Sequence, residues 1–164
     1  MTDSPSSDER WMREALREAE CAKAEGEVPV GAVVVHVGMV VGRGHNRCEA
    51  LCDPTAHAEI VALGAAGSAL GTWRMPNATL YVTLEPCTMC AGAVLLARVG
   101  TVVFAVPDPT MGACGSTIDL LYEARLAGRL TVRIGALAEE SAALMSSFFS
   151  ARRETPKAEG CRSG

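Results

Sequence analysis

The sequence predicts an α/β fold, a three-layer α/β/α sandwich with a mixed five-stranded sheet in the middle. Three observations lead to this prediction. Short runs of β-branched residues alternate along the chain with segments whose apolar residues recur every three or four positions. About 24 residues separate the fourth and fifth expected strands, which is enough for a helical crossover, so we expect these last two strands to be parallel. The length of 164 residues fits one domain.

The first part of the chain predicts a helix followed by a hairpin. Asp8 is the expected N-cap of the helix and Gly26 its stop. The β-branched run 30–35 is typical of a strand buried on both faces. A turn at Val37-Gly38 then leads to a returning strand at 39–42. The apolar residues that define the helix are Trp11, Met12, Ala15, Leu16, Ala19 and Ala22.

The second part predicts alternating helices and strands. A helix that carries His57 is expected to fray in the stretch 64–71, because glycine disfavours helical backbone. Pro86 breaks the chain before the next helix, and a loop rich in proline and glycine is expected over 107–115. The remaining expected elements are strand 78–83, helix 87–97, strand 101–105, helix 119–127, strand 130–134 and a final amphipathic helix with apolar residues from Leu137 to Phe149.

Composition limits the function classes. The formal net charge is −4, so bulk charge does not indicate nucleic-acid binding. The sequence has no apolar run near the roughly 20 residues that span a bilayer, and we expect no membrane association. Seven cysteines without disulfide-scaffold spacing favour a reducing cytoplasm. We expect residues 1–7 to be a disordered leader, 8–155 the folded domain and 156–164 a flexible tail.

Two short motifs carry the chemistry. His57-Ala58-Glu59 and Pro86-Cys87-Thr88-Met89-Cys90 supply one histidine and two cysteines, three side chains that bind zinc. Structural zinc sites are closed by four protein ligands, whereas catalytic sites keep one position open for water. Both motifs are expected at helix starts, where negative charge such as a thiolate is favoured. The sequence therefore predicts a catalytic zinc centre with one zinc ion per subunit, and the His-x-Glu and Pro-Cys-x-x-Cys pattern resembles the signature of zinc-dependent base deaminases.

Glu59 is the predicted catalytic residue. Zinc lowers the pKa of a water that it binds from roughly 15.7 to about 7, which makes that water a nucleophile at neutral pH. A carboxylate two residues from His57 is better suited to moving protons than to closing the metal site. We expect Glu59 to take a proton from the water and to deliver it to a ring nitrogen and then to the leaving amine.

Other interpretations of the cysteines are weighed against this one. A Cys-x-x-Cys pair is often a redox pair in a cytosolic protein, but the upstream His-x-Glu favours zinc. A closed structural site would need a fourth ligand, for which His45, Cys48 and Cys52 are candidates by type. Cys21 and Cys114 are expected to fill space in the core.

The motifs and their flanking blocks resemble the bacterial tRNA-specific adenosine deaminases, over residues 8–155. The zinc motif alone is shared with cytidine, cytosine, guanine and deoxycytidylate deaminases, and the flanking blocks narrow the choice. These blocks are Glu27 to Val33, Gly44-His45-Asn46-Arg47, Asp53 to Ile60, Leu80 to Ala93, Gly112 to Ser116, and Phe148-Phe149 followed by Arg152-Arg153.

The resemblance implies a cytidine-deaminase-like fold, a homodimer, and conversion of adenosine to inosine at the wobble position of a tRNA anticodon stem-loop, chiefly in an arginine tRNA. It implies zinc ligation by His57, Cys87 and Cys90, with Glu59 as the proton shuttle. Asn46, the backbone of Ala58 and Leu84 would contact the flipped adenine. Asp108 would approach the ribose and neighbouring nucleotides. The final helix, through Phe149 and Arg152 or Arg153, would lie near the anticodon loop.

Two alternative functions remain open at this point. One is a small-molecule deaminase that acts on guanine, cytosine or cytidine, which the acidic pI of about 5.4 favours slightly. The other is a zinc protein without catalytic activity, such as an RNA-binding partner subunit. Glu59 argues against the second alternative, because an inactive relative would be expected to lack the proton shuttle.

Overall fold

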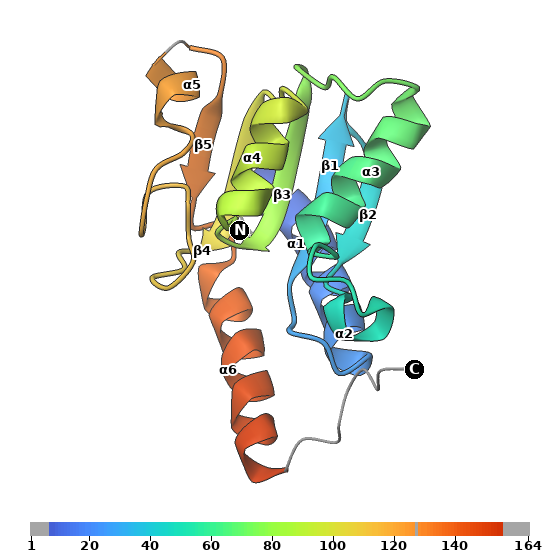
Figure 1. Ribbon diagram of the computed structural model, residues 1–164, viewed down its shortest axis with the longest axis vertical. Helices are drawn as coiled ribbons and strands as arrows, with labels where there is room; N and C mark the ends of the chain where they lie inside the picture. The colour runs from blue at the N-terminus through green and yellow to red at the C-terminus, as the bar shows by residue number, and fades with distance from the viewer. Residues whose placement is uncertain (1–6, 127, 156–164) are drawn as a thin grey trace, which may run out of the picture.

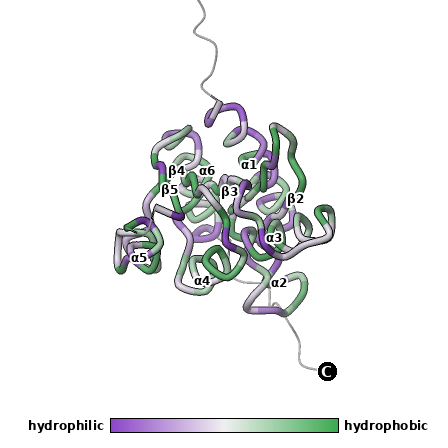
Figure 2. The backbone as a smooth tube through the Cα atoms, turned by 90° about the horizontal axis from the view of Figure 1, so that it is seen from above, coloured by the Kyte–Doolittle hydropathy of each residue, from purple (hydrophilic) through white to green (hydrophobic). Residues whose placement is uncertain are grey.

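The computed structural model describes residues 7–126 and 128–155. It is the predicted three-layer sandwich, with helices on both faces of one five-stranded sheet (Figures 1 and 2). The helices are α1 (Ser7–Ala24), α2 (Cys48–Leu51), α3 (Ala58–Leu70), α4 (Thr88–Leu96), α5 (Tyr122–Leu126) and α6 (Ala138–Glu154). The strands are β1 (Gly31–His36), β2 (Met39–His45), β3 (Ala78–Leu84), β4 (Thr101–Val106) and β5 (Thr131–Ile134).

The sheet is mixed, as the sequence predicts. Its strand order is β2-β1-β3-β4-β5. β1 pairs antiparallel with β2 and β3, whereas β3, β4 and β5 are parallel to one another. The parallel pair β4–β5 confirms the crossover that the spacing indicates. The carboxyl ends of β3 and β4 therefore lie at one edge of the sheet, which is where ligands gather in open α/β sheets.

Helices α3 and α4 cover one face of the sheet, and α1 and α6 cover the other, as the view along the sheet shows (Figure 2). β1 lies between the two layers, and five of its six residues are buried, which agrees with its continuous β-branched sequence. The main core is aliphatic, with Phe104 as its large aromatic residue. No helix in the described part of the chain is both long and apolar enough to cross a membrane.

Two glycines of β2 let α3 lie directly against the sheet. A Cβ atom at Gly42 would come within 2.2 Å of the carbonyl oxygen of Ala62, and one at Gly44 within 2.4 Å of the carbonyl oxygen of Ala58. Any side chain at these positions would push the helix away from the strand. Gly42 and Gly44 therefore set the depth at which the first turn of α3 sits.

The structure corrects several local predictions. The stretch 64–71 does not fray: α3 continues to Leu70 and ends at Gly71, whose positive φ of 66° closes the helix. The buried face of the helix, which includes Ala62 and Ala66, supplies packing that outweighs the low helix propensity of glycine. The short helix α2 was not expected, and β2 runs three residues beyond the predicted 39–42.

The predicted leader and tail can be compared with the structure at one residue, Ser7. α1 already begins at Ser7, so that residue is helical rather than part of a leader. The other residues of the predicted leader, 1–6, and the whole predicted tail, 156–164, lie outside the described residues.

Candidate metal centre and substrate pocket

Three metal-ligand side chains meet where two helices begin. His57 is the N-cap of α3, Cys87 is the N-cap of α4, and Cys90 lies in the first turn of α4. The Nδ1 atom of His57 lies 3.6 Å from the Sγ atom of Cys87 and 3.6 Å from that of Cys90. Zinc bonds to nitrogen and sulfur at a tetrahedral angle place these atoms about 3.5 Å apart. The donor set therefore fits a zinc ion.

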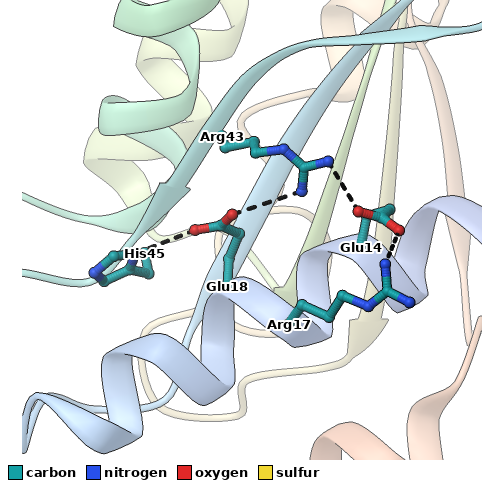
Figure 3. Close-up of polar contacts among 5 residues, drawn as sticks. All are labelled: Glu14, Arg17, Glu18, Arg43 and His45. Carbon is teal, nitrogen blue, oxygen red and sulfur yellow. Dashed lines mark hydrogen bonds and ion pairs between the residues drawn. The ribbon is translucent and has the colours of Figure 1, made fainter.

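A fourth protein ligand does not join this cluster within residues 7–126 and 128–155. The ring of His45 contacts Glu18 instead, with 3.2 Å between Nδ1 and a carboxylate oxygen (Figure 3). The Cys48 thiol lies 3.5 Å from the side-chain oxygen of Asn46, and Cys52 is outside the cluster as well. The arrangement is that of an open zinc site with room for water, not of a closed structural one.

Hydrogen bonds within the cluster favour one thiolate before any metal binds. The Cys90 thiol and then the His57 ring lower the pKa of Cys87 to about 3. The same contact with Cys87, together with burial, raises the pKa of Cys90. A bound cation deprotonates the thiols that coordinate it, so both cysteines can serve as anionic ligands.

Glu59 lies in the first turn of α3, next to the three donors. Its side chain is 4 % exposed and faces the same cavity as His57 and Cys87. Burial raises the pKa of Glu59, because desolvation outweighs both the hydrogen bond from the residue's own backbone and the favourable charge of the His57 ring. A raised pKa favours proton uptake by a carboxylate, which is what a proton shuttle requires.

A cavity of about 230 Å³ opens beside the metal donors. Pockets for drug-sized ligands have volumes of about 300–1,000 Å³, so this smaller cavity suits a group such as a single nucleobase. Ala58 does not line it, since its side chain is fully buried between the two motif residues. The lining includes six residues that the sequence singles out, namely Asn46, His57, Glu59, Leu84, Cys87 and Asp108, together with Val28, Val30, Glu85 and Met111.

Glu85 is a cavity-lining residue whose role in holding a loop the sequence analysis missed. Its carboxylate accepts hydrogen bonds from the backbone N–H groups of Asp108 (2.9 Å), Cys114 (2.9 Å) and Ser116 (3.1 Å), and from the Ser116 hydroxyl. Burial opposes ionisation, but these donors together lower the pKa of Glu85. Glu85 therefore holds the loop after β4 against the cavity. Its position immediately before Pro86-Cys87 marks it as a neighbour of the metal motif, but no local pattern indicates the loop that it holds.

The loop that Glu85 holds has its own internal turn. The Asp108 carboxylate accepts hydrogen bonds from the N–H groups of Thr110 (2.9 Å) and Met111 (3.2 Å). A Cβ atom at Gly112 would lie 2.5 Å from the Glu85 carboxyl group, so the close approach requires glycine there. Asp108 consequently reaches the cavity as part of a fixed loop.

The predicted RNA-contacting residues of α6 lie away from the cavity. Phe148 is buried, whereas Phe149 is 42 % exposed and packs edge-on against it at 5.3 Å between ring centroids. The Arg152 guanidinium lies 5.1 Å from the centre of the Phe148 ring, and the Arg153 guanidinium donates to the Ser150 hydroxyl. Figure 1 shows α6 extending beyond the end of the sheet where β5 stops.

The cysteine predictions had mixed outcomes. Cys114 is buried, as expected of a core residue, but the prediction for Cys21 was wrong. Cys21 lies on the exposed face of α1, because the buried positions of that helix are Met12, Ala15, Ala19 and Ala22.

Comparison with known proteins places this centre in a family. The model of the cytidine and deoxycytidylate deaminase zinc-binding region matches residues 5–106, a range that contains His57, Glu59, Cys87 and Cys90. The chain belongs to this deaminase family. The family match and the geometry of the donors agree on zinc as the cofactor.

Individual members of this deaminase family are similar to the chain over most of its length. The tRNA-specific adenosine deaminase of Bacillus subtilis (strain 168) is 48% identical over 153 residues, which cover 93% of this chain and 95% of the relative. A solved structure from a study of A-to-I editing by tRNA:A34 deaminases is 43% identical, with a TM-score of 0.77, and the match covers 82% of this chain and 98% of that one. A guanine deaminase from Nitrosomonas europaea is 26% identical, with a TM-score of 0.77, and the match covers 90% of this chain and 86% of that one.

Proposed function

We propose that this deaminase hydrolyses adenosine to inosine at the wobble position of a tRNA anticodon, chiefly in an arginine tRNA. One observation carries the proposal: an open three-donor metal site and a buried glutamate face a cavity of base size, in a chain 48% identical to a tRNA-specific adenosine deaminase. The cytoplasm, where tRNA is modified and where free thiols persist, is the expected location.

His57, Cys87 and Cys90 would hold one zinc ion per chain, which when bound supplies an activated water as the nucleophile. Glu59 would accept one proton from the attacking water at its carboxylate and deliver it to the N1 atom of the adenine ring. As the C6–O bond forms and the C6–N6 bond breaks, Glu59 would take the second proton from the new hydroxyl group and pass it to the departing amine. Water and adenosine are thereby consumed, and inosine and ammonia are formed.

The cavity wall supplies the contacts that orient the base. The Asn46 carboxamide would hydrogen-bond the adenine ring, and Leu84 would pack on its face. Ala58 is not among the cavity-lining residues, so a contact of its backbone with the base stays a prediction from the family resemblance. Asp108 would meet the ribose and the adjacent nucleotides from the loop after β4. An unpaired anticodon base can enter such a pocket at low cost, because no duplex has to open.

The end of α6 would contact the rest of the anticodon stem-loop. Phe149 exposes an aromatic ring on which a base can stack, while Arg152 and Arg153 carry positive charge in the last turn. Local charge at the contact surface is sufficient for phosphate binding, so the net charge of −4 does not oppose an RNA substrate.

The decisive experiment follows inosine formation position by position. Purified, zinc-loaded protein is incubated with a transcribed arginine tRNA that carries adenosine at the wobble position, and inosine is read by reverse transcription. The matched control is the same tRNA with adenosine moved one position along the loop. Conversion at the wobble position alone is the expected result. No conversion by folded, zinc-bound protein would overturn the proposal.

Guanine deamination is the second candidate, because the guanine deaminase of similar fold is 26% identical over 90% of this chain. Incubation with free guanine, cytosine and cytidine, with ammonia release as the readout, tests it directly. Turnover of a free base at about 1–10³ per second, with the tRNA unmodified, would make the small-molecule function the correct one.

We further propose a homodimer that buries the outer face of α3 and α4. A groove of about 580 Å³ runs between these helices, and Leu96 and Trp73 beside it are 74 % and 59 % exposed. Large apolar residues grouped in this way are typical of subunit interfaces, and a second copy of the chain is the occupant that we expect. Leu96→Glu should convert a dimer into a monomer in analytical ultracentrifugation, and a wild-type monomer would exclude this interface.

A further inference from the structure

The Asn46 backbone is fixed at the cavity wall, but its side chain has two rotatable bonds. The Asn46 N–H donates to the Val30 carbonyl oxygen at 3.1 Å, and the Arg47 N–H donates to that of Ala56 at 2.9 Å. The preceding residue, His45, contacts Glu18 of α1 within the charged network that fastens β2 to this helix (Figure 3). These contacts place the Cα atom of Asn46 without deciding which end of its carboxamide faces the cavity.

Cys48 contacts that carboxamide directly. Its thiol donates to the Oδ1 atom of Asn46, with 3.5 Å between sulfur and oxygen, a hydrogen-bond distance for the large sulfur atom. Cys48 begins the short helix α2, which is itself held in place. The Ala50 N–H donates at 2.8 Å to Glu27, a carboxylate that is 1 % exposed, and the Asp53 N–H donates at 3.1 Å to the Cys48 carbonyl oxygen.

The thiol stays protonated under physiological conditions. Burial and the nearby carboxylates, first that of Glu27, raise the pKa of Cys48 above its ordinary value. A protonated thiol can donate but offers little as an acceptor. The partner that suits it is therefore the oxygen of the Asn46 carboxamide, not the nitrogen.

We propose that Cys48 is a positioning residue for the substrate base, acting through Asn46. With Oδ1 held by the thiol, the Nδ2 hydrogens of Asn46 remain as donors for a ring nitrogen of a purine. A carboxamide turned by 180° would instead set its oxygen against a ring nitrogen that also carries a lone pair. The inference rests on the proposed function, because it takes the base in the cavity to be a purine.

The test combines kinetics with a measurement that needs no substrate. Cys48→Ala should lower kcat/KM for the wobble adenosine by about threefold to tenfold, the range for one neutral hydrogen bond. Cys48→Ser retains a donor and should recover most of that loss. In an Asn46→Ala background, Cys48→Ala should have no further effect, because the group through which it acts is gone. Cys21→Ala, which removes an exposed thiol of α1, is the matched control and should change nothing.

The second measurement is the NMR order parameter of the Asn46 side-chain amide in zinc-loaded protein. It should fall in Cys48→Ala and recover in Cys48→Ser. An unchanged order parameter, or equal losses from Cys48→Ala in the wild-type and Asn46→Ala backgrounds, would overturn the role of Cys48. A fall in the order parameter in a protein that leaves tRNA unmodified would keep the Cys48–Asn46 coupling and refute the proposed function instead.

Discussion

The first turn of α3 and the end of β3 each place one glutamate against the same cavity, and the two glutamates differ in what surrounds them. Glu59 is 4 % exposed and Glu85 is 2 % exposed, so their exposed areas do not distinguish them, although Glu59 lies among more protein atoms and is desolvated more strongly. Burial raises the pKa of Glu59. At Glu85 burial acts in the same direction, but the Ser116 hydroxyl and three backbone N–H groups outweigh it and lower the pKa.

The difference shows how hydrogen-bond donors assign a role to a buried carboxylate. A carboxylate whose oxygens are filled by fixed donors, like that of Glu85, stays ionised and acts as a brace for the loop. A carboxylate with a raised pKa beside a metal centre, like that of Glu59, can take up and release protons. We therefore propose that the same residue type supports structure at Glu85 and chemistry at Glu59 in one cavity.

Loss of the metal should have the largest effect, because it removes the chemistry that Glu59 serves and leaves the brace at Glu85 in place. We expect Cys87→Ala to lose bound zinc and all detectable turnover, and chelation of the wild type to do the same reversibly. Zinc content by mass spectrometry, with inosine formation on the same samples, measures both. Cys21→Ala is the control. A Cys87→Ala protein with a full complement of zinc and normal turnover would refute the ligand assignment.

Glu59→Gln should have the next largest effect. The amide has almost the same shape but cannot exchange protons, so the single-turnover rate should fall by about 10²–10⁴-fold. Zinc content should remain at one ion per chain. The free energy of unfolding should stay equal or rise, because a buried carboxylate with a raised pKa is replaced by a neutral group. Turnover near the wild-type rate would show that another group moves the protons.

Glu85→Gln should act mainly on stability. The amide nitrogen of glutamine cannot accept the hydrogen bonds that the second carboxylate oxygen now accepts, so one or two backbone and hydroxyl donors lose their partner. We expect a loss of about 2–3 kcal/mol in the free energy of unfolding, the range for hydrogen bonds to a charged group. Urea denaturation of zinc-loaded samples measures it. A variant as stable as the wild type would mean that the loop after β4 does not depend on this brace.

The pH dependence of that stability difference is the smallest expected effect. Because the folded pKa of Glu85 lies below its ordinary value of 4.5, its stabilising contribution is fully present above about pH 4.5. It is lost as the pH falls through the folded pKa. The difference between wild type and Glu85→Gln should therefore be constant near neutrality and narrow below pH 4.5. A difference that widens on acidification would contradict the lowered pKa.

The same contrast explains which features the sequence could predict. The metal donors were predictable because ligand type and spacing are local, and both motifs begin helices. The role of Glu85 depends on a loop whose contacting residues lie 23 to 31 residues further along the chain, and only the fold brings this loop to it. Similarly, the glycines Gly42 and Gly44 gain their meaning from the backbone of α3, a contact that no local pattern contains.

Errors of element length have a related cause. Propensity predicted fraying of α3 at its glycines, but burial of alanines such as Ala62 and Ala66 against β2 decides the length of that helix. α2 is one turn long and has no apolar periodicity, and hydrogen bonds from outside hold it, such as that between Glu27 and the Ala50 N–H. In both cases tertiary contacts override a weak local preference.

The most direct measurement compares Glu59→Gln and Glu85→Gln side by side, each by single-turnover inosine formation at the tRNA wobble position and by urea unfolding. We predict opposite outcomes for the two variants. Glu59→Gln should lower the single-turnover rate by at least about 10²-fold without loss of stability. Glu85→Gln should lower the free energy of unfolding by about 2–3 kcal/mol and reduce the rate much less. If both variants lose rate and stability in parallel, the two glutamates do not have separate roles and the account is wrong.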